Sequence, residues 1–141
     1  MSQCLLAKLQ VRGPAGCPRD SRVGRGLATG SYERQPVGAE LLLYNGGRIT
    51  QRRTLLIYIR PDRGVSWVAV SRWSSRPDGL ELDIQLPTIT ILAGTPPPYV
   101  NAIELYFKPT FLRARCGSFW SVTGYLITGD EVSTSDRTAC P

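Results

Sequence analysis

The sequence predicts an all-β protein, a single β-sandwich or jelly-roll-like domain of about eight strands. Short apolar runs alternate with polar residues at a period of two, most regularly in GLELDIQL at 79–86. The fourteen glycines and eleven prolines are spread between such runs, as is typical of turns between short strands. No long window has the 3.6-residue period of an amphipathic helix. A chain of 141 residues has the length of about one domain.

The core of the predicted domain spans residues 39–128 and begins with three strands. AELLLYN is followed by Gly46-Gly47, which predicts a hairpin turn. RITQRRTLLIYIR ends at the turn sequence PDRG, and its alternation places Leu55, Ile57 and Ile59 on one face and Leu56 and Tyr58 on the other. VSWVAVSRW follows, with apolar residues at both odd and even positions, so that apolar side chains point to both faces of the strand. Strands of this kind are covered on both faces.

The next strands are half exposed. Residues 80–86 alternate strictly after the turn sequence RPDG, and Pro87 then predicts an edge, a bend or a bulge because proline cannot donate to a ladder. NAIELYFK at 101–108 alternates in the same way. TFLRARCG and FWSVTGYLIT complete the predicted set.

The two ends of the chain have a different composition. Residues 1–38 predict a short strand at 4–12 followed by an extended arm rich in Arg, Gly and Pro. Such a segment is either an arm that orders on a neighbouring subunit or a linker. Residues 129–141 predict a polar C-terminal tail.

The net charge of +6 is unevenly placed. Residues 1–63 hold eleven basic and four acidic residues, whereas residues 64–141 hold six and seven. Fifteen of the seventeen basic residues are arginines, which reflects either the base composition of the genome or a surface that contacts an acidic protein or nucleic acid. The candidate contact residues are Arg12, Arg19, Arg22, Arg25, Arg48, Arg52 and Arg53.

Four cysteines lie at Cys4, Cys17, Cys116 and Cys140, without the spacing of a zinc site. They allow two disulfides in three connectivities, or free thiols in a reducing compartment. Pairing Cys4 with Cys17 and Cys116 with Cys140 would close two local loops.

The sequence contains no histidine, so the Ser–His and Cys–His arrangements of hydrolases are absent. Glu81 and Asp83 share a strand face near Glu104 in the predicted sheet, but solvated carboxylates are the simpler interpretation. No glycine loop binds a nucleotide here, and no apolar run reaches the length of a membrane span. We therefore expect no enzymatic activity, no cofactor, no metal, no signal peptide and no membrane contact.

PPPY at 96–99 matches the short PPxY pattern read by WW domains, although a stiff loop between two strands explains it equally well. Pro97 and Tyr99 are therefore further candidate contact residues. Trp73 and Tyr99 border turns and would supply the aromatic platform of a carbohydrate- or protein-binding module.

The plan of the chain resembles that of small viral and phage shell components, such as capsid decoration (cement) proteins and jelly-roll coat proteins. The resemblance lies in this plan, a β-domain with an arm and a tail, and does not extend to any sequence motif. It implies a non-enzymatic structural protein of a virion that contacts a major shell protein or neighbouring copies of itself, with a trimer as one expected form. A β-sandwich or barrel binding module for nucleic acid or carbohydrate is the alternative.

Overall fold

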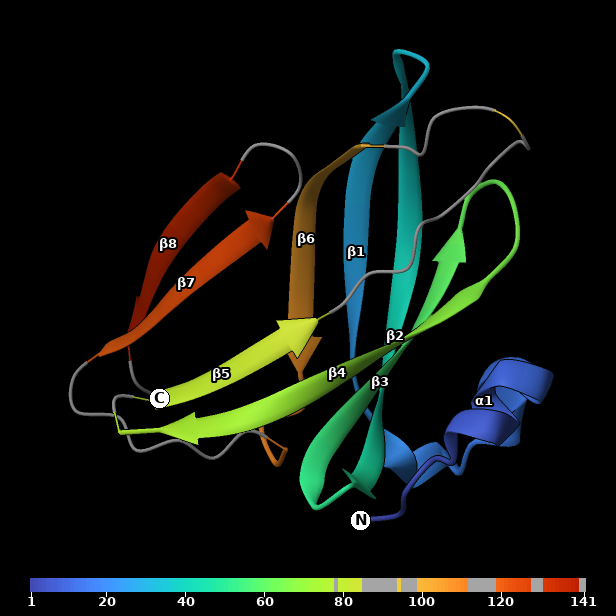
Figure 1. Cartoon of the computed structure of the whole chain (residues 1–141), viewed down its shortest axis with the longest axis vertical. Helices are drawn as coiled ribbons and strands as arrows, with labels where there is room; N and C mark the ends of the chain where they lie inside the picture. The colour runs from blue at the N-terminus through green and yellow to red at the C-terminus, as the bar shows by residue number, and fades with distance from the viewer. Residues whose placement is uncertain (78, 85–93, 95–98, 112–118, 128–130, 140–141) are drawn as a thin grey trace.

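The computed structural model describes residues 1–77, 79–84, 94, 99–111, 119–127 and 131–139 (Figure 1). The chain begins with one α-helix, α1 (Leu6–Arg12), and two 3₁₀ turns, η1 (Gly13–Gly16) and η2 (Arg19–Ser21). The strands are β1 (Arg22–Tyr32), β2 (Gln35–Ile49), β3 (Arg52–Pro61), β4 (Trp67–Arg76), β5 (Gly79–Ile84), β6 (Tyr99–Phe107), β7 (Phe119–Ile127) and β8 (Glu131–Ala139).

The strands form a six-stranded sheet in the order β5-β4-β3-β2-β1-β6 and a two-stranded sheet of β7 and β8. Every described pairing is antiparallel. The larger sheet is strongly curled (Figure 1), and the curl brings the ring of Trp73 on β4 to 5.9 Å, between centroids, from that of Phe107 on the edge strand β6. The all-β class predicted from the sequence is confirmed, and the sandwich or jelly-roll arrangement stays a prediction.

The concave face of the curled sheet holds the larger hydrophobic core. Its fully buried members come from four adjacent strands and include Val23, Leu43, Leu55 and Ile57. Partly buried residues from both edges of the sheet pack against them: Leu82 and Ile84 of β5, and Ile103, Leu105 and Phe107 of β6. The alternation predicted for these strands is confirmed, because Leu56 and Tyr58 belong instead to the cluster on the convex face.

The convex face is covered in part by α1, where the sequence predicted a strand at 4–12. That prediction was wrong because residues 6–10 all favour a helix, and the spacing of Leu6 and Leu9 places both on one helical face. Leu9 is fully buried against Leu42, Leu56 and their neighbours. Within the described residues, no helix combines the length and apolar character required to cross a membrane.

The predicted irregular arm at 13–38 contains β1 and the start of β2. The strand was missed because glycines occupy core-facing positions, where a periodicity analysis expects large apolar residues. A methyl group on Gly26 would lie 2.8 Å from Leu105 Cδ2 and closer still to the backbone of Glu104. The side chains of β2 and β6 therefore fill the space that β1 leaves empty, and Arg22 and Arg25 lie on a strand that is hydrogen-bonded on both sides.

The hairpin turn predicted at Gly46-Gly47 lies instead at Thr50 and Gln51. The glycines form a register shift within β2, where Gly47 has φ +72°. Thr50 and Gln51 have φ values of +50° and +64°, the left-handed conformation that a two-residue hairpin turn requires, although neither residue favours it.

The predicted polar tail at 129–141 contains β8, which pairs with β7 from Phe119↔Ala139 to Ile127↔Glu131. A polar segment rich in Thr and Ser can form a strand when a neighbouring strand supplies the backbone hydrogen bonds. Of the predicted strand TFLRARCG, Thr110 and Phe111 lie in a turn after β6, and 112–118 lie outside the described residues, as do Leu86 and Pro87.

Candidate functional site: a basic groove

A groove of about 780 Å³ opens where the η1–η2 segment meets the ends of β1 and β6. Four of the residues that line it carry a positive charge: Arg19, Arg22, Arg25 and Lys108. We refer to this site as the basic groove. The rest of its lining is uncharged, and consists of Pro14, Ala15, Cys17, Pro18, Gly24, Tyr44, Tyr106 and Phe107.

The sheet positions the cations of the basic groove. Arg25 of β1 pairs in register with Tyr106 of β6 on one side and with Leu42 of β2 on the other. Arg22 pairs with Tyr44 at the start of the strand. Lys108 follows β6, and its backbone N–H donates to the carbonyl of Val23 at 2.7 Å. Backbone hydrogen bonds of the sheet and its border therefore fix the backbone positions of Arg22, Arg25 and Lys108.

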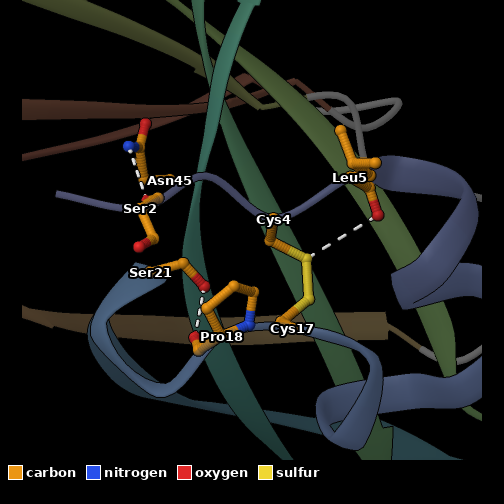
Figure 2. The surroundings of a disulfide bond; sticks show 7 residues. All are labelled: Ser2, Cys4, Leu5, Cys17, Pro18, Ser21 and Asn45. Carbon is orange, nitrogen blue, oxygen red and sulfur yellow. Dashed lines mark hydrogen bonds between the residues drawn. A yellow bond between two sulfur atoms is a disulfide. The ribbon is translucent and has the colours of Figure 1, made fainter.

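The opposite wall of the groove is fixed by a disulfide between Cys4 and Cys17, one of the pairings that the sequence left open (Figure 2). Their Cα atoms lie 4.9 Å apart, within the usual range for a disulfide. Cys4 is buried beside Leu9, and Cys17 lines the groove. The bond thus joins the segment that precedes α1 to the segment that carries η1 and η2.

Asn45 anchors the N-terminal segment to β2. Its side-chain amide donates to the carbonyl of Ser2 at 3.1 Å (Figure 2). Its backbone carbonyl accepts from the N–H of Cys4 at 2.8 Å. At η2, the buried Ser21 hydroxyl donates to the carbonyl of Pro18 at 2.6 Å. The Cys4 end of the disulfide-bonded loop is therefore bonded to β2, and the segment after Cys17 is closed by a bond within η2.

Two tyrosines in the groove remain neutral phenols. Burial raises the pKa of Tyr44, against the opposing effect of the nearby Arg22 and Arg60 guanidinium groups. The Tyr106 hydroxyl donates to Glu104 Oε2 at 2.9 Å, and this bond raises the pKa of Tyr106. Tyr44 is 4% exposed and Tyr106 is 56% exposed, so only the Tyr106 ring offers a broad face to a ligand.

The residues that line the groove carry four positive charges and no negative charge. Within the described residues, no salt bridge joins any of its four cations to an acidic side chain, whereas Arg60 pairs with Glu40 on the same face of the sheet. Asp20, which follows Arg19 in the sequence, accepts hydrogen bonds from the N–H and hydroxyl of Ser2 and does not line the groove.

The remaining predicted contact residues lie elsewhere. Arg12 is exposed at the end of α1. Arg48, Arg52 and Arg53 are exposed on the β2–β3 hairpin, which extends past the start of β1, and none of them lines the groove. Tyr99 begins β6, and Pro97, Cys116 and Cys140 lie outside the described residues.

The structure adds Tyr44, Tyr106 and Lys108 to the three arginines that the sequence singled out. One signal for Tyr106 was present in the sequence. The alternation of NAIELYFK places its ring on the polar face of the strand, where an aromatic residue has no core to join. Tyr44 and Lys108 gave no such signal, because their place in the groove depends on strand register.

Glu104 does not lie on a strand next to that of Glu81 and Asp83, the two carboxylates considered as a catalytic pair. Glu81 and Asp83 lie on β5 and Glu104 lies on β6, at opposite edges of the six-stranded sheet. In the described part of the chain, no group of three or more acidic, cysteine or histidine residues could hold a metal ion. No protein-family model, curated protein or solved structure matches the chain.

Proposed function

We propose that this protein is a non-enzymatic structural protein of a virus or phage particle, a decoration protein or other shell or tail component that acts through protein–protein contacts. The observation that supports the proposal best is the basic groove, whose four cations lack acidic partners within the described residues. A surface of this kind attracts an acidic partner and limits the orientations in which it docks.

The rigidity of the groove supports the same proposal. Arg22 and Arg25 lie on a strand with a partner on each side, so little backbone entropy is lost when they bind. A structural protein of a particle needs such a fixed contact surface, because each copy must dock in the same geometry. The sandwich or jelly-roll arrangement predicted from the sequence is part of this proposal.

A nucleic-acid-binding role is the second candidate, favoured by the exposed Tyr106 ring beside Arg25. A base could stack on the ring while the guanidinium contacts a phosphate. Binding of this kind would weaken steeply as the salt concentration rises.

Particle association tests the main proposal. Particles from a lysate of the producing host are banded on a density gradient, treated with nuclease and probed with an antibody raised against the chain. We expect the protein to cosediment with intact particles before and after nuclease treatment. Its presence only at the top of the gradient would contradict a structural role.

Light scattering behind a sizing column, at low and at high salt, separates the two candidates. We expect a discrete species free of nucleic acid by its absorbance at 260 and 280 nm, either an oligomer or a monomer that binds particles in the gradient assay. A protein that carries nucleic acid at low salt and releases it at high salt would favour the second candidate.

A further inference from the structure

The basic groove combines two kinds of surface. Arg19, Arg25 and Lys108 are exposed cations, whereas Pro14 and Phe107 add partly buried apolar surface between them. A ligand that fills this site must therefore supply negative charge and apolar groups in one short stretch. A free inorganic anion would leave the apolar surface without a partner.

Within the described residues, the four cations of the basic groove form no ion pair, so they are available to a ligand. The Asp20 carboxylate is engaged by Ser2, and the Glu104 carboxylate accepts from Tyr106. Three of the four cations are arginines, whose planar guanidinium groups form paired hydrogen bonds with carboxylates.

We infer that the basic groove binds a short acidic peptide segment of a partner protein, with its carboxylates at Arg19, Arg22, Arg25 and Lys108 and an apolar side chain against Pro14, Ala15 and Phe107. This inference rests on the proposed function, since it names the type of segment that a neighbouring protein of the particle would supply. The occupant is defined by charge complementarity and by the apolar lining of the groove.

A peptide fits the groove better than a single strand of nucleic acid. Extended binding of nucleic acid requires several exposed aromatic rings along a basic track. Of the rings that line the groove, Tyr44 is 4% exposed and Phe107 is partly buried among the rings of Trp73 and Phe111, so only Tyr106 is available for stacking.

The test measures binding to the full chain by fluorescence anisotropy. The probe is a fluorescein-labelled peptide in which aspartate and glutamate residues flank two leucines. We expect saturable binding by the wild type and a Kd at least about tenfold weaker for R19A/R25A, because two charge-assisted contacts are lost. Both arginines are exposed, so the variant is expected to fold, and its circular dichroism and Tm are recorded alongside.

The matched control is R63A/R72A, which removes the same charge from two exposed positions outside the groove. We expect its Kd to stay within about twofold of the wild type, because a general loss of charge has a small effect at moderate salt. An equal loss in both double variants would overturn the inference, since it would indicate attraction by net charge alone. So would an absence of binding by the wild type.

Two further probes identify the ligand class. A peptide with serines in place of the leucines is expected to bind at least about fivefold more weakly, because its contact with the apolar surface is lost. Labelled oligothymidylate is expected to bind more weakly than the acidic peptide. Tighter binding of oligothymidylate that is lost in R19A/R25A would assign the groove to nucleic acid and overturn the peptide inference.

The proposed particle role and the proposed peptide site can be disproved separately. If R19A/R25A still cosediments with particles as the wild type does, the groove is not the docking site, although the particle role stands. If the chain never cosediments and yet binds the acidic peptide through the groove, the particle role is wrong and the groove keeps its assigned ligand.

Discussion

At the scale of single residues, Asp20 shows how one exposed side chain secures the N-terminal segment. Its Oδ2 accepts from the Ser2 hydroxyl at 2.6 Å and from the Ser2 N–H at 3.1 Å. These bonds, the hydroxyl one foremost, lower the pKa of Asp20 below its usual value of 3.8. Ser2 is also bonded to Asn45 of β2, so the carboxylate links η2 to the sheet through the N-terminus.

This shift predicts a pH dependence. Because the pKa is lower in the folded chain than in the unfolded chain, the ionised Asp20 stabilises the fold above the unfolded pKa, and this contribution is lost as the pH falls through the folded pKa. We expect the fall in Tm between neutral pH and about pH 3 to be smaller in Asp20→Asn than in the wild type. Thermal melts followed by circular dichroism measure both, with the exposed Asp83→Asn as the control. An unchanged acid dependence in Asp20→Asn would show that the Ser2 bonds do not contribute.

At the scale of elements, α1 is held to the convex face by one buried side chain and one covalent bond. A helix of seven residues is not stable alone in water, so its formation depends on this packing. Leu9 is fully buried, whereas Leu5, four positions earlier, is 56% exposed. The disulfide between Cys4 and Cys17 ties together the two segments that flank the helix.

Paired leucine truncations test the packing of α1. We expect Leu9→Ala to lower the free energy of unfolding by about 2 to 4 kcal/mol, because it leaves a cavity under the helix. Leu5→Ala removes the same atoms from an exposed position and should cost less than about 0.5 kcal/mol. Urea unfolding curves of the two variants measure the difference. Equal losses would mean that α1 does not pack as the structure shows.

A change in the β2–β3 turn is expected to raise the free energy of unfolding. Thr50 and Gln51 both have positive φ, a conformation that Asn and Gly adopt at lower cost. We expect Thr50→Asn/Gln51→Gly to raise the free energy of unfolding by about 1 kcal/mol. Gly47→Ala should lower it, because Gly47 has φ +72° and lies against the Gln3 side chain. Thermal melts measure whether each variant is more or less stable than the wild type. A less stable Asn-Gly variant would mean that the turn lies elsewhere.

Some elements were readable from the sequence and others were not, for physical reasons. The two-residue repeat of a strand identified the faces of β3 and β6, because apolar side chains there enter a core. β1 was missed because Gly26 faces that core without a side chain, and glycine in a sequence normally indicates a turn. The groove could not be predicted, because it depends on the register that brings Arg25 beside Tyr106.

At the scale of the whole molecule, charge is distributed unequally along the strands. The end with the groove and the β2–β3 hairpin carries arginines with few acidic neighbours. Toward the other end, Glu40 pairs with Arg60 at 3.2 Å, and Asp62 accepts from the N–H of Gly38. An acidic partner would therefore be attracted to one end of the sheet, which is where the basic groove lies.

The shape that supports this groove depends on the rings that close the curl. Phe107 contacts Trp73 at 5.9 Å and Phe111 at 6.0 Å on the concave face, whereas Tyr106 points to the convex face and is 56% exposed. We expect Phe107→Ala to lower the free energy of unfolding by about 3 kcal/mol and Tyr106→Ala to lower it by less than about 1 kcal/mol. Urea unfolding followed by tryptophan fluorescence compares these adjacent truncations. If Tyr106→Ala were as costly as Phe107→Ala, the concave ring cluster would not be what holds β6 to β4, and the curl of the sheet would need another cause.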